Sequence, residues 1–373
     1  MIKKTIKFLL FNMALSAGLF HRRKIPRQPR RIFILASGYL GDTFWAVQTI
    51  HLLKKKYPDA ELYIGGKPFI SDLCYNLLPE QNLRIIRSVI SDRQREKVSL
   101  PMILSESKTI RQEIKPDLLI DLVCNRYSAL FLFCTSAYTV GMDYADEFYP
   151  LYSFCAKQAL IPGVHLAERP DSIVKQFLGI TDISERKMIP PCPRYNKEEL
   201  FRKYSLNANE KLIMLIPGAG WETKRWADGH FNTLGRRLAD YGYKIVISGS
   251  PAEKTLCTEV AQGIPNALIL CDSLAETISF LPHCKVAIGN DSGVTHLAAS
   301  FGIKVFALYC QTNPDFCGAL GADTHYFRAA CPCAPGNGEH FCHGGPTHVC
   351  NRAERMAIDP ETLIQEITAQ LPG

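Results

Sequence analysis

The feature that most constrains the fold is a series of short apolar runs alternating with helical patterns, which occurs twice along the chain. The first series begins at residues 31–37 (RIFILAS) and the second at 211–216 (KLIMLI). Runs this short and this rich in Ile and Leu are typical of strands buried on both faces of a parallel sheet. Alternation of strand and helix therefore predicts an α/β fold with two parallel, Rossmann-like sheets, each covered by helices.

The expected elements follow from the same periodicity. In the first series we expect strands at 31–37, 61–64, 118–123 and 139–142, with helices at 43–56 and 126–136. In the second we expect strands at 211–216, 244–248, 267–270, 286–289 and 304–309. A last helix is expected to begin with Asp359 as N-cap and Pro360 at the first helical position. Its apolar stripe consists of Leu363, Ile364, Ile367 and Leu371.

A cluster of prolines divides the two series. The sequence IPPCP at 189–193, followed by a charged stretch, is typical of a connector between domains. We expect a leader at 1–30, an N-terminal domain at 31–185, a linker at 186–210, a second domain at 211–358 and a C-terminal helix at 359–373. Two such domains predict a cleft between them, with ligands beyond the carboxyl ends of the strands.

The positive charge of the chain is concentrated at its start. The net charge is +7, but residues 1–31 hold nine Lys or Arg and no acidic residue, which leaves 34 basic and 36 acidic residues elsewhere. The folded part therefore gives no reason to expect nucleic-acid binding. The apolar stretch at 8–20 is too short to cross a bilayer as a helix. Its basic flanks favour a helix lying on an anionic membrane surface, although a disordered leader is the alternative.

The fourteen cysteines fall into two groups. Several stand singly in apolar runs and are expected to be buried, reduced thiols of a cytoplasmic protein: Cys124, Cys134, Cys271, Cys284 and Cys310. The second group, Cys331, Cys333, Cys342 and Cys350, lies in a loop rich in Pro, Gly and His. Four thiols there are able to hold a structural zinc, but the C-x-C spacing departs from the usual one. Either unbridged thiols or disulfides are therefore favoured over a metal site.

The first loop that follows a strand is SGYLGD at 37–42. Its glycines, Gly38 and Gly41, allow the backbone to approach a ligand, and Asp42 lies near the start of the next helix. Asp42 is either a helix cap or a catalytic carboxylate, and position alone does not decide between them. The loop does not have the G-x-G-x-x-G pattern, which argues against a nicotinamide-dependent dehydrogenase.

The second domain opens with the loop PGAGWETKRW at 217–226. It offers a flexible backbone, an aromatic surface, the Thr223 hydroxyl and the Lys224 and Arg225 cations just past a strand. Such cations can neutralise a diphosphate, although exposed basic turns are also common.

Two further loops carry polar side chains. In GNDSGVTH at 289–296, the amides of Ser292, Gly293 and Val294 are expected to point toward phosphate oxygens from a helix N-terminus. Asp291 is expected to order that turn rather than touch phosphate, and His296 is either a site residue or a core histidine. Glu253, in SGSPAE, is either a ribose-binding carboxylate or an acidic residue favoured by the helix dipole.

Taken together and in this order, the segments resemble glycosyltransferase family 9, the ADP-heptose:lipopolysaccharide heptosyltransferases. The similar stretches run from about residue 31 to 315, and the most specific is IGNDSGVTHLAASFGIKVFALYCQTNP. The resemblance implies the GT-B fold, in which two Rossmann-like domains face a central cleft. It also implies an inverting transfer of heptose, or a related sugar, from a nucleotide diphosphate sugar to a hydroxyl of the lipopolysaccharide core.

The resemblance also assigns roles to residues of this chain. Asp42 matches the catalytic base, Lys224 the lysine that contacts the donor phosphates, and Glu253 the nucleoside-binding position. Asp291, Ser292, Gly293 and His296 match the motif around the nucleotide. Tyr39 stands where many members have a smaller residue, and with Gly38 and Gly41 it is expected to shape the acceptor side.

These expectations describe an enzyme that uses no metal ion or other cofactor, because Lys224 and a helix terminus can take the place of a divalent cation. Its partners would be the donor, the core acceptor and, through the leader, the inner face of the cytoplasmic membrane. The alternative is a non-catalytic partner in envelope polysaccharide assembly that binds nucleotide sugars. Such a protein would keep the motifs of the second domain but would not need Asp42.

Overall fold

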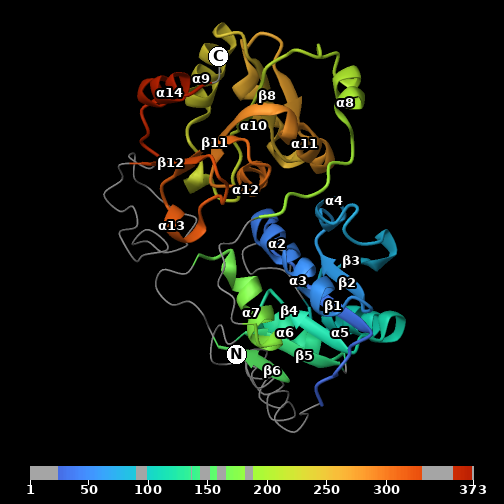
Figure 1. Cartoon of the computed structure of the whole chain (residues 1–373). Helices are drawn as coiled ribbons and strands as arrows, with labels where there is room; N and C mark the ends of the chain where they lie inside the picture. Colours follow the sequence, from blue (N-terminus) through green and yellow to red (C-terminus); the bar gives the residue numbers. More distant parts are fainter. Residues whose placement is uncertain are drawn as a thin grey trace. The chain divides into compact units, whose positions relative to one another are not determined.

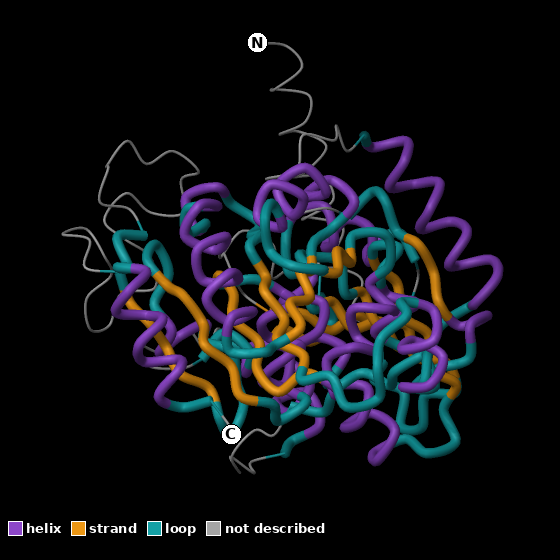
Figure 2. Tube along the Cα trace, turned by 90° about the horizontal axis from the view of Figure 1, so that it is seen from above, coloured by secondary structure: helices purple, strands orange, loops and turns teal. Residues whose placement is uncertain are grey.

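The computed structural model describes residues 24–89, 99–135, 137–142, 152–157, 165–180, 188–329 and 356–371. The chain divides into two compact units, Met1–Ile161 with Ala167–Glu185 (unit 1), and Pro162–Leu166 with Arg186–Gly373 (unit 2). Within the described ranges, helices and strands alternate along the chain (Figure 1), and the strands lie among helices (Figure 2). No helix in these ranges is long and apolar enough to cross a membrane.

Unit 1 is built on a six-stranded parallel sheet with strand order β3-β2-β1-β4-β5-β6. Its strands are β1 (Arg31–Leu35), β2 (Glu61–Gly66), β3 (Leu83–Ile85), β4 (Leu118–Asp121), β5 (Tyr138–Met142) and β6 (Phe154–Ala156). Its helices are α2 (Leu40–Val47), α3 (Thr49–Lys56), α4 (Ile70–Leu73), η1 (Glu80–Asn82), α5 (Leu100–Thr109), η2 (Ile110–Ile114), α6 (Arg126–Phe133) and α7 (Glu168–Leu178).

Unit 2 repeats the same arrangement, with strand order β12-β11-β10-β7-β8-β9. Its strands are β7 (Leu212–Ile216), β8 (Lys244–Ser248), β9 (Leu268–Leu270), β10 (Cys284–Asn290), β11 (Lys304–Tyr309) and β12 (Thr324–Arg328). Its helices are α8 (Lys197–Lys203), η4 (Glu222–Lys224), α9 (Asp228–Asp240), η5 (Pro251–Glu253), α10 (Lys254–Ala261), α11 (Leu274–Phe280), η6 (Leu281–His283), α12 (Gly293–Ser300), α13 (Pro314–Cys317) and α14 (Pro360–Ala369).

Both strand orders are that of the Rossmann fold, so the prediction of two parallel α/β sheets is confirmed. In each unit the second and third strands are added on one side of the first strand, and the fourth strand pairs with its other side. The strands that flank this switch point are β1 and β4 in unit 1 and β7 and β10 in unit 2. Ligands of open α/β sheets bind where the loops leave these strands.

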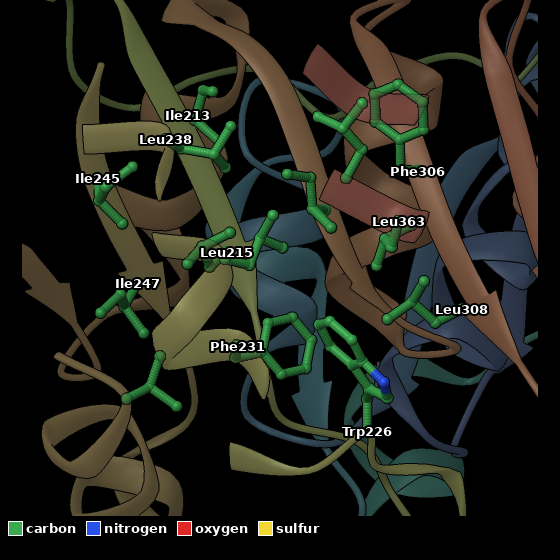
Figure 3. Packing of buried hydrophobic residues seen from close by; sticks show 14 of the residues in the cluster. Ile213, Leu215, Trp226, Phe231, Leu238, Ile245, Ile247, Phe306, Leu308 and Leu363 are labelled. Atoms are coloured by element: carbon green, nitrogen blue, oxygen red, sulfur yellow. The ribbon is translucent and has the colours of Figure 1, made fainter. Parts of the chain in front are cut away.

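The core of unit 2 lies between its sheet and helices α9, α10 and α14, and Figure 3 shows part of this packing. Trp226 packs against Phe231, with ring centroids 5.2 Å apart, and neither side chain is exposed. Helix α14 begins as predicted, because the Asp359 carboxylate accepts from the Thr362 amide at 2.8 Å. The expected stripe covers the core through Leu363 and Ile367.

One local prediction needs correction. The helix expected at 43–56 is two helices, α2 and α3, which meet at Gln48, and α2 already begins at Leu40. Asp42, expected near the start of that helix, lies in the first turn of α2. The expected linker, described from residue 188, contains α8 and packs on α11, where the Tyr204 hydroxyl donates to Glu276 at 2.7 Å.

Candidate functional site

The loop after β7, residues 217–226, is held at both ends by one buried side chain. The Asn290 amide donates to the Pro217 carbonyl at 2.7 Å, and its oxygen accepts from the Trp226 amide at 3.0 Å. The Trp226 indole also donates to the carbonyl of Ile358 at 2.9 Å. The loop is therefore anchored to the core at the switch point.

Lys224 lies at the centre of unit 2's candidate site. Its ammonium is 2.6 Å from the Asp291 carboxylate, which follows β10, and 4.6 Å from the centroid of the Trp221 ring. The Lys224 side chain is 16% exposed and that of Asp291 only 6%. A lysine and an aspartate that are 67 residues apart thus meet where adjacent strands β7 and β10 end.

Asp291 joins the loops of three strands. The hydroxyl of Thr312, which follows β11, donates to its Oδ2 at 2.6 Å, and His296 Nε2 lies 3.6 Å from its Oδ1. Burial opposes ionisation of this carboxyl, but the Lys224 ammonium and His296 outweigh it and hold the pKa of Asp291 below its ordinary value. The carboxylate is thus charged at neutral pH, and it links the loops that follow β7, β10 and β11.

Helix α12 begins beside this pair. Ser292 is its N-cap, and Ser292, Gly293 and Val294 are all partly exposed, whereas His296 is buried one turn further on. The first amides of an α-helix have no partner within the helix and attract anions. The helix N-terminus and the partly exposed Lys224 ammonium therefore lie together at one edge of the sheet.

Glu253 borders the same loop from the end of β8. Its carboxylate accepts from the amide and the hydroxyl of Ser250, at 2.8 and 2.7 Å, and lies 3.6 Å from the Arg225 guanidinium. A Cβ on Gly218 would overlap this carboxylate, so the glycine is what lets the two loops approach. Glu253 therefore caps its own short helix and also lies beside the loop that carries Lys224.

Two expectations for the loop after β7 are not met. The Thr223 hydroxyl, expected to face the donor, is buried and donates to the Gln311 side chain. Trp221 and Trp226 were expected to offer an aromatic surface, but both are buried. These side chains instead fix the conformation of the loop, and its cations remain at least partly exposed.

In unit 1, Asp42 is exposed at the start of α2 and is not packed in the interior. It occupies the third helical position, and its Oδ2 accepts from the Tyr39 amide at 3.2 Å in a capping box. A Cβ on Gly38 would lie 2.9 Å from the Cβ of Asp42, which explains the glycine. Asp42 thus has the capping role, and its exposure leaves the carboxylate accessible to a substrate.

The rest of that loop is less exposed. Gly41 is buried, whereas the Tyr39 ring is partly exposed and lies 5.4 Å from the Lys67 ammonium, which follows β2. Tyr39 and Lys67 therefore place an aromatic ring and a cation at the same edge of the sheet as Asp42.

The sequence analysis missed Asp121, which ends β4 at the switch point of unit 1. This fully buried carboxylate accepts from the amides of Val123 and Cys124, at 2.9 and 3.0 Å, and from the Tyr152 hydroxyl at 2.6 Å. Burial raises its pKa, against the opposing effect of hydrogen bonds from Ser128 and Tyr152. A polar residue at the end of an apolar run, in LLID, was the available signal.

The structure tests the predictions for the first group of cysteines but not those for the second. Cys124, Cys271, Cys284 and Cys310 are buried as expected, and Cys134 is only partly buried. Burial raises the pKa of the Cys284 thiol to about 12, which makes it unreactive. Cys331, Cys333, Cys342 and Cys350 lie outside the described residues, as does most of the leader.

The chain matches a known protein family. The model of glycosyltransferase family 9 (heptosyltransferase) matches residues 105–341, which include the Lys224 and Asp291 loops and begin after Asp42. The chain belongs to glycosyltransferase family 9. Family 9 membership thus rests mainly on unit 2 and on the later part of unit 1.

Individual relatives agree with this family. Lipopolysaccharide heptosyltransferase 1 of Pseudomonas aeruginosa is 31% identical over 125 residues, which cover 33% of this chain and 35% of the relative. Lipopolysaccharide heptosyltransferase 2 of Escherichia coli is 27% identical over 177 residues, 45% of this chain and 49% of the relative. The chain thus spans between a third and a half of the length of these curated relatives.

A solved structure extends the likeness to the whole fold. The structure of E. coli ADP-heptose lps heptosyltransferase II superimposes with a TM-score of 0.69 over 91% of this chain and 98% of that one. Sequence identity is 19%, so this match establishes the architecture, which is the predicted GT-B type, and not the substrate.

Proposed function

We propose that the protein is an inverting glycosyltransferase that moves a heptose from ADP-heptose to a hydroxyl of the lipopolysaccharide core. The observation that carries the proposal is the Lys224 ammonium of unit 2, which is held by Asp291 beside the N-terminus of α12. Its place at the switch point of a family 9 chain supports a nucleotide diphosphate as the group it binds.

The reaction needs a base and a stabilised leaving group. The acceptor hydroxyl would attack the anomeric carbon and give its proton to the Asp42 carboxylate. The bond from that carbon to the diphosphate oxygen would break, and ADP would leave with the bonding electrons. Lys224 and the amides of Ser292 and Gly293 would stabilise the charge on the departing phosphates.

We propose that this transfer requires no divalent cation, because an ammonium and a helix terminus already supply the positive potential that a metal ion would provide. Glu253 is proposed to accept hydrogen bonds from the nucleoside. The acceptor suggests action at the inner face of the cytoplasmic membrane, with the basic leader touching lipid.

A donor-panel transfer assay tests the proposal. Purified protein is incubated with ADP-heptose, and separately with other nucleotide sugars, on a core oligosaccharide that lacks heptose, and products are read by mass spectrometry. The expected product carries the mass of one added heptose, its anomeric configuration by NMR is inverted relative to the donor, and it forms equally in excess EDTA. Donor binding without transfer or hydrolysis would instead identify a non-catalytic partner.

A further inference from the structure

One surface of unit 1 takes no part in the site described above. Helix α5 continues into the π-helical turn η2, and together they cover one side of the sheet (α5, teal in Figure 1). Their inner face is apolar, since Ile103, Ile110 and Ile114 are buried in the core of unit 1. The two outer flanks differ sharply in charge.

One flank carries the acidic residues, and both are engaged by the segment around β3. The Glu106 carboxylate accepts from the amides of Arg87 and Ser88, at 3.0 and 2.9 Å. Glu113 lies 3.9 Å from the Arg84 guanidinium. These contacts fix the rotation of the helix and direct its acidic residues away from the other flank.

The opposite flank combines leucines with cations. Residues 100, 104, 108, 111 and 115 follow at intervals of four, four, three and four, which places them on one line along a helix. We call this line the cationic flank: Leu100, Leu104, Lys108, Arg111 and Lys115. Leu100 and Leu104 are 41% and 45% exposed, and the three basic side chains are exposed as well. Lys108, Arg111, Gln112 and Lys115 line a hollow in the surface.

We infer that the cationic flank docks on an anionic phospholipid bilayer. Exposed leucines beside lysines and arginine are the chemistry of a helix that lies in a membrane interface, where apolar side chains enter the acyl boundary and cations meet headgroup phosphates. Beyond residue 31 the chain holds 34 basic and 36 acidic residues, so this charge is local and complementary to an anionic surface. The choice of lipid over other polyanions rests on the proposed function, whose acceptor is part of a lipid.

Vesicle binding by the full chain tests the inference without donor or acceptor. The variant K108E/R111E/K115E is compared with wild type on vesicles of phosphatidylglycerol and phosphatidylcholine, and on phosphatidylcholine alone. The expected loss of partition onto anionic vesicles is about 100-fold or more, since each basic residue near such a surface contributes about fivefold. Any contribution of the leader is the same in both proteins.

The matched control is K55E/K56E/K285E, which makes the same change in charge at three exposed lysines outside the flank. It is expected to bind anionic vesicles within about threefold of wild type, because none of the three lysines belongs to the cationic flank that would meet the headgroups. L100S/L104S is expected to lower partition about tenfold, including at high salt, because it removes apolar area and no charge. These side chains are exposed, and thermal melting checks that every variant remains folded.

Equal vesicle binding by K108E/R111E/K115E and its control would overturn the inference. The inference would also be overturned if charge reversal of the flank reduced binding of RNA or DNA but left vesicle binding unchanged. The same holds if the leucine variants changed only the oligomeric state. Heptose transfer to a soluble core oligosaccharide is measured in parallel and is expected to be unaffected. Loss of the membrane site and failure of the proposed function are thereby distinguished.

Discussion

The two units share one strand order, yet the aspartates near the ends of the corresponding strands β4 and β10 have pKa values shifted in opposite directions. Asp121 ends β4 and Asp291 follows β10, and each of these strands lies beside the first strand of its sheet. Both carboxylates are buried. The pKa of Asp121 is raised by burial, whereas Lys224 and His296 outweigh burial and lower that of Asp291.

The difference lies in the hydrogen-bond donors. Asp121 accepts from two backbone amides and a tyrosine hydroxyl and holds a turn in which Cys124 has a φ of +55°. Asp291 accepts from an ammonium and a threonine hydroxyl. One topology therefore serves to fix a backbone turn in unit 1 and to position the Lys224 ammonium, which we propose binds phosphate, in unit 2.

The largest expected effect comes from breaking the pair in unit 2. Lys224→Met leaves the buried Asp291 charge without its ammonium, and loss of one partner of a buried pair costs about 3–5 kcal/mol. Urea unfolding measures this loss, and calorimetry with ADP is expected to show weaker binding. The double variant K224M/D291N should regain part of the stability but not the affinity. A K224M protein as stable as wild type would show that the pair contributes nothing to folding.

A smaller effect is expected from the turn in unit 1. Asp121→Ala leaves the Val123 and Cys124 amides and the Tyr152 hydroxyl unsatisfied, at a cost of about 2–4 kcal/mol in the free energy of unfolding. Asp121→Asn keeps an acceptor for the amides and removes a buried carboxyl, so its cost is about 1 kcal/mol or less. Equal losses for the two variants in urea unfolding would mean that the charge of Asp121 matters and not its acceptor oxygen.

The next effect in size is expected from adding a side chain at Gly218, which lies against Glu253. Gly218→Ala drives a methyl group into the Glu253 carboxylate, which must move away from Ser250 and Arg225. We expect a loss of about 1–3 kcal/mol in stability together with weaker ADP binding. The control is Gly229→Ala, since a Cβ there meets nothing within 4 Å. If both alanines leave ADP affinity unchanged, Glu253 does not belong to the nucleotide site.

The smallest effect is a pair of opposite pH dependences, at most about 1.4 kcal/mol per pH unit for each group. The folded pKa of Asp291 is lowered, so its contribution to stability is present above about pH 4 and is lost as the pH falls further. The folded pKa of Asp121 is raised, so its contribution is present below about pH 4 and is lost as the pH rises through the folded value.

Urea unfolding of wild type, D291N and D121N across this pH range measures both dependences. The difference in the free energy of unfolding between wild type and D291N should shrink in acid. The same difference between wild type and D121N should shrink or change sign as the pH rises toward neutrality. Two curves with the same slope would contradict the assignment of opposite shifts.

The fold was predictable where the sequence carries long apolar runs. Inner strands of both sheets, such as β1, β7 and β11, were placed within two residues because every position after the first residue of each is buried. The edge strands β3, β6 and β12 were missed, and all three contain partly exposed residues. Their sequences lack the continuous run that marks a strand buried on both faces.

The candidate site was predictable as a set of loops but not as a set of contacts. Lys224, Asp291 and Glu253 were singled out because they follow strands. The partners Asn290 and Thr312 were not, since a side chain's contacts depend on which strands are neighbours. The strand order brings β7, β10 and β11 together although they are far apart in the chain, and no local pattern encodes that order.

The central claim is that Asp42 supplies the base and the unit 2 cluster binds the donor phosphates. Steady-state transfer from ADP-heptose by D42N, with donor affinity measured by calorimetry, tests it most directly. The account predicts a kcat reduced about 10²–10⁴-fold and a donor Kd close to that of wild type. A D42N enzyme that transfers heptose at the wild-type rate would contradict it.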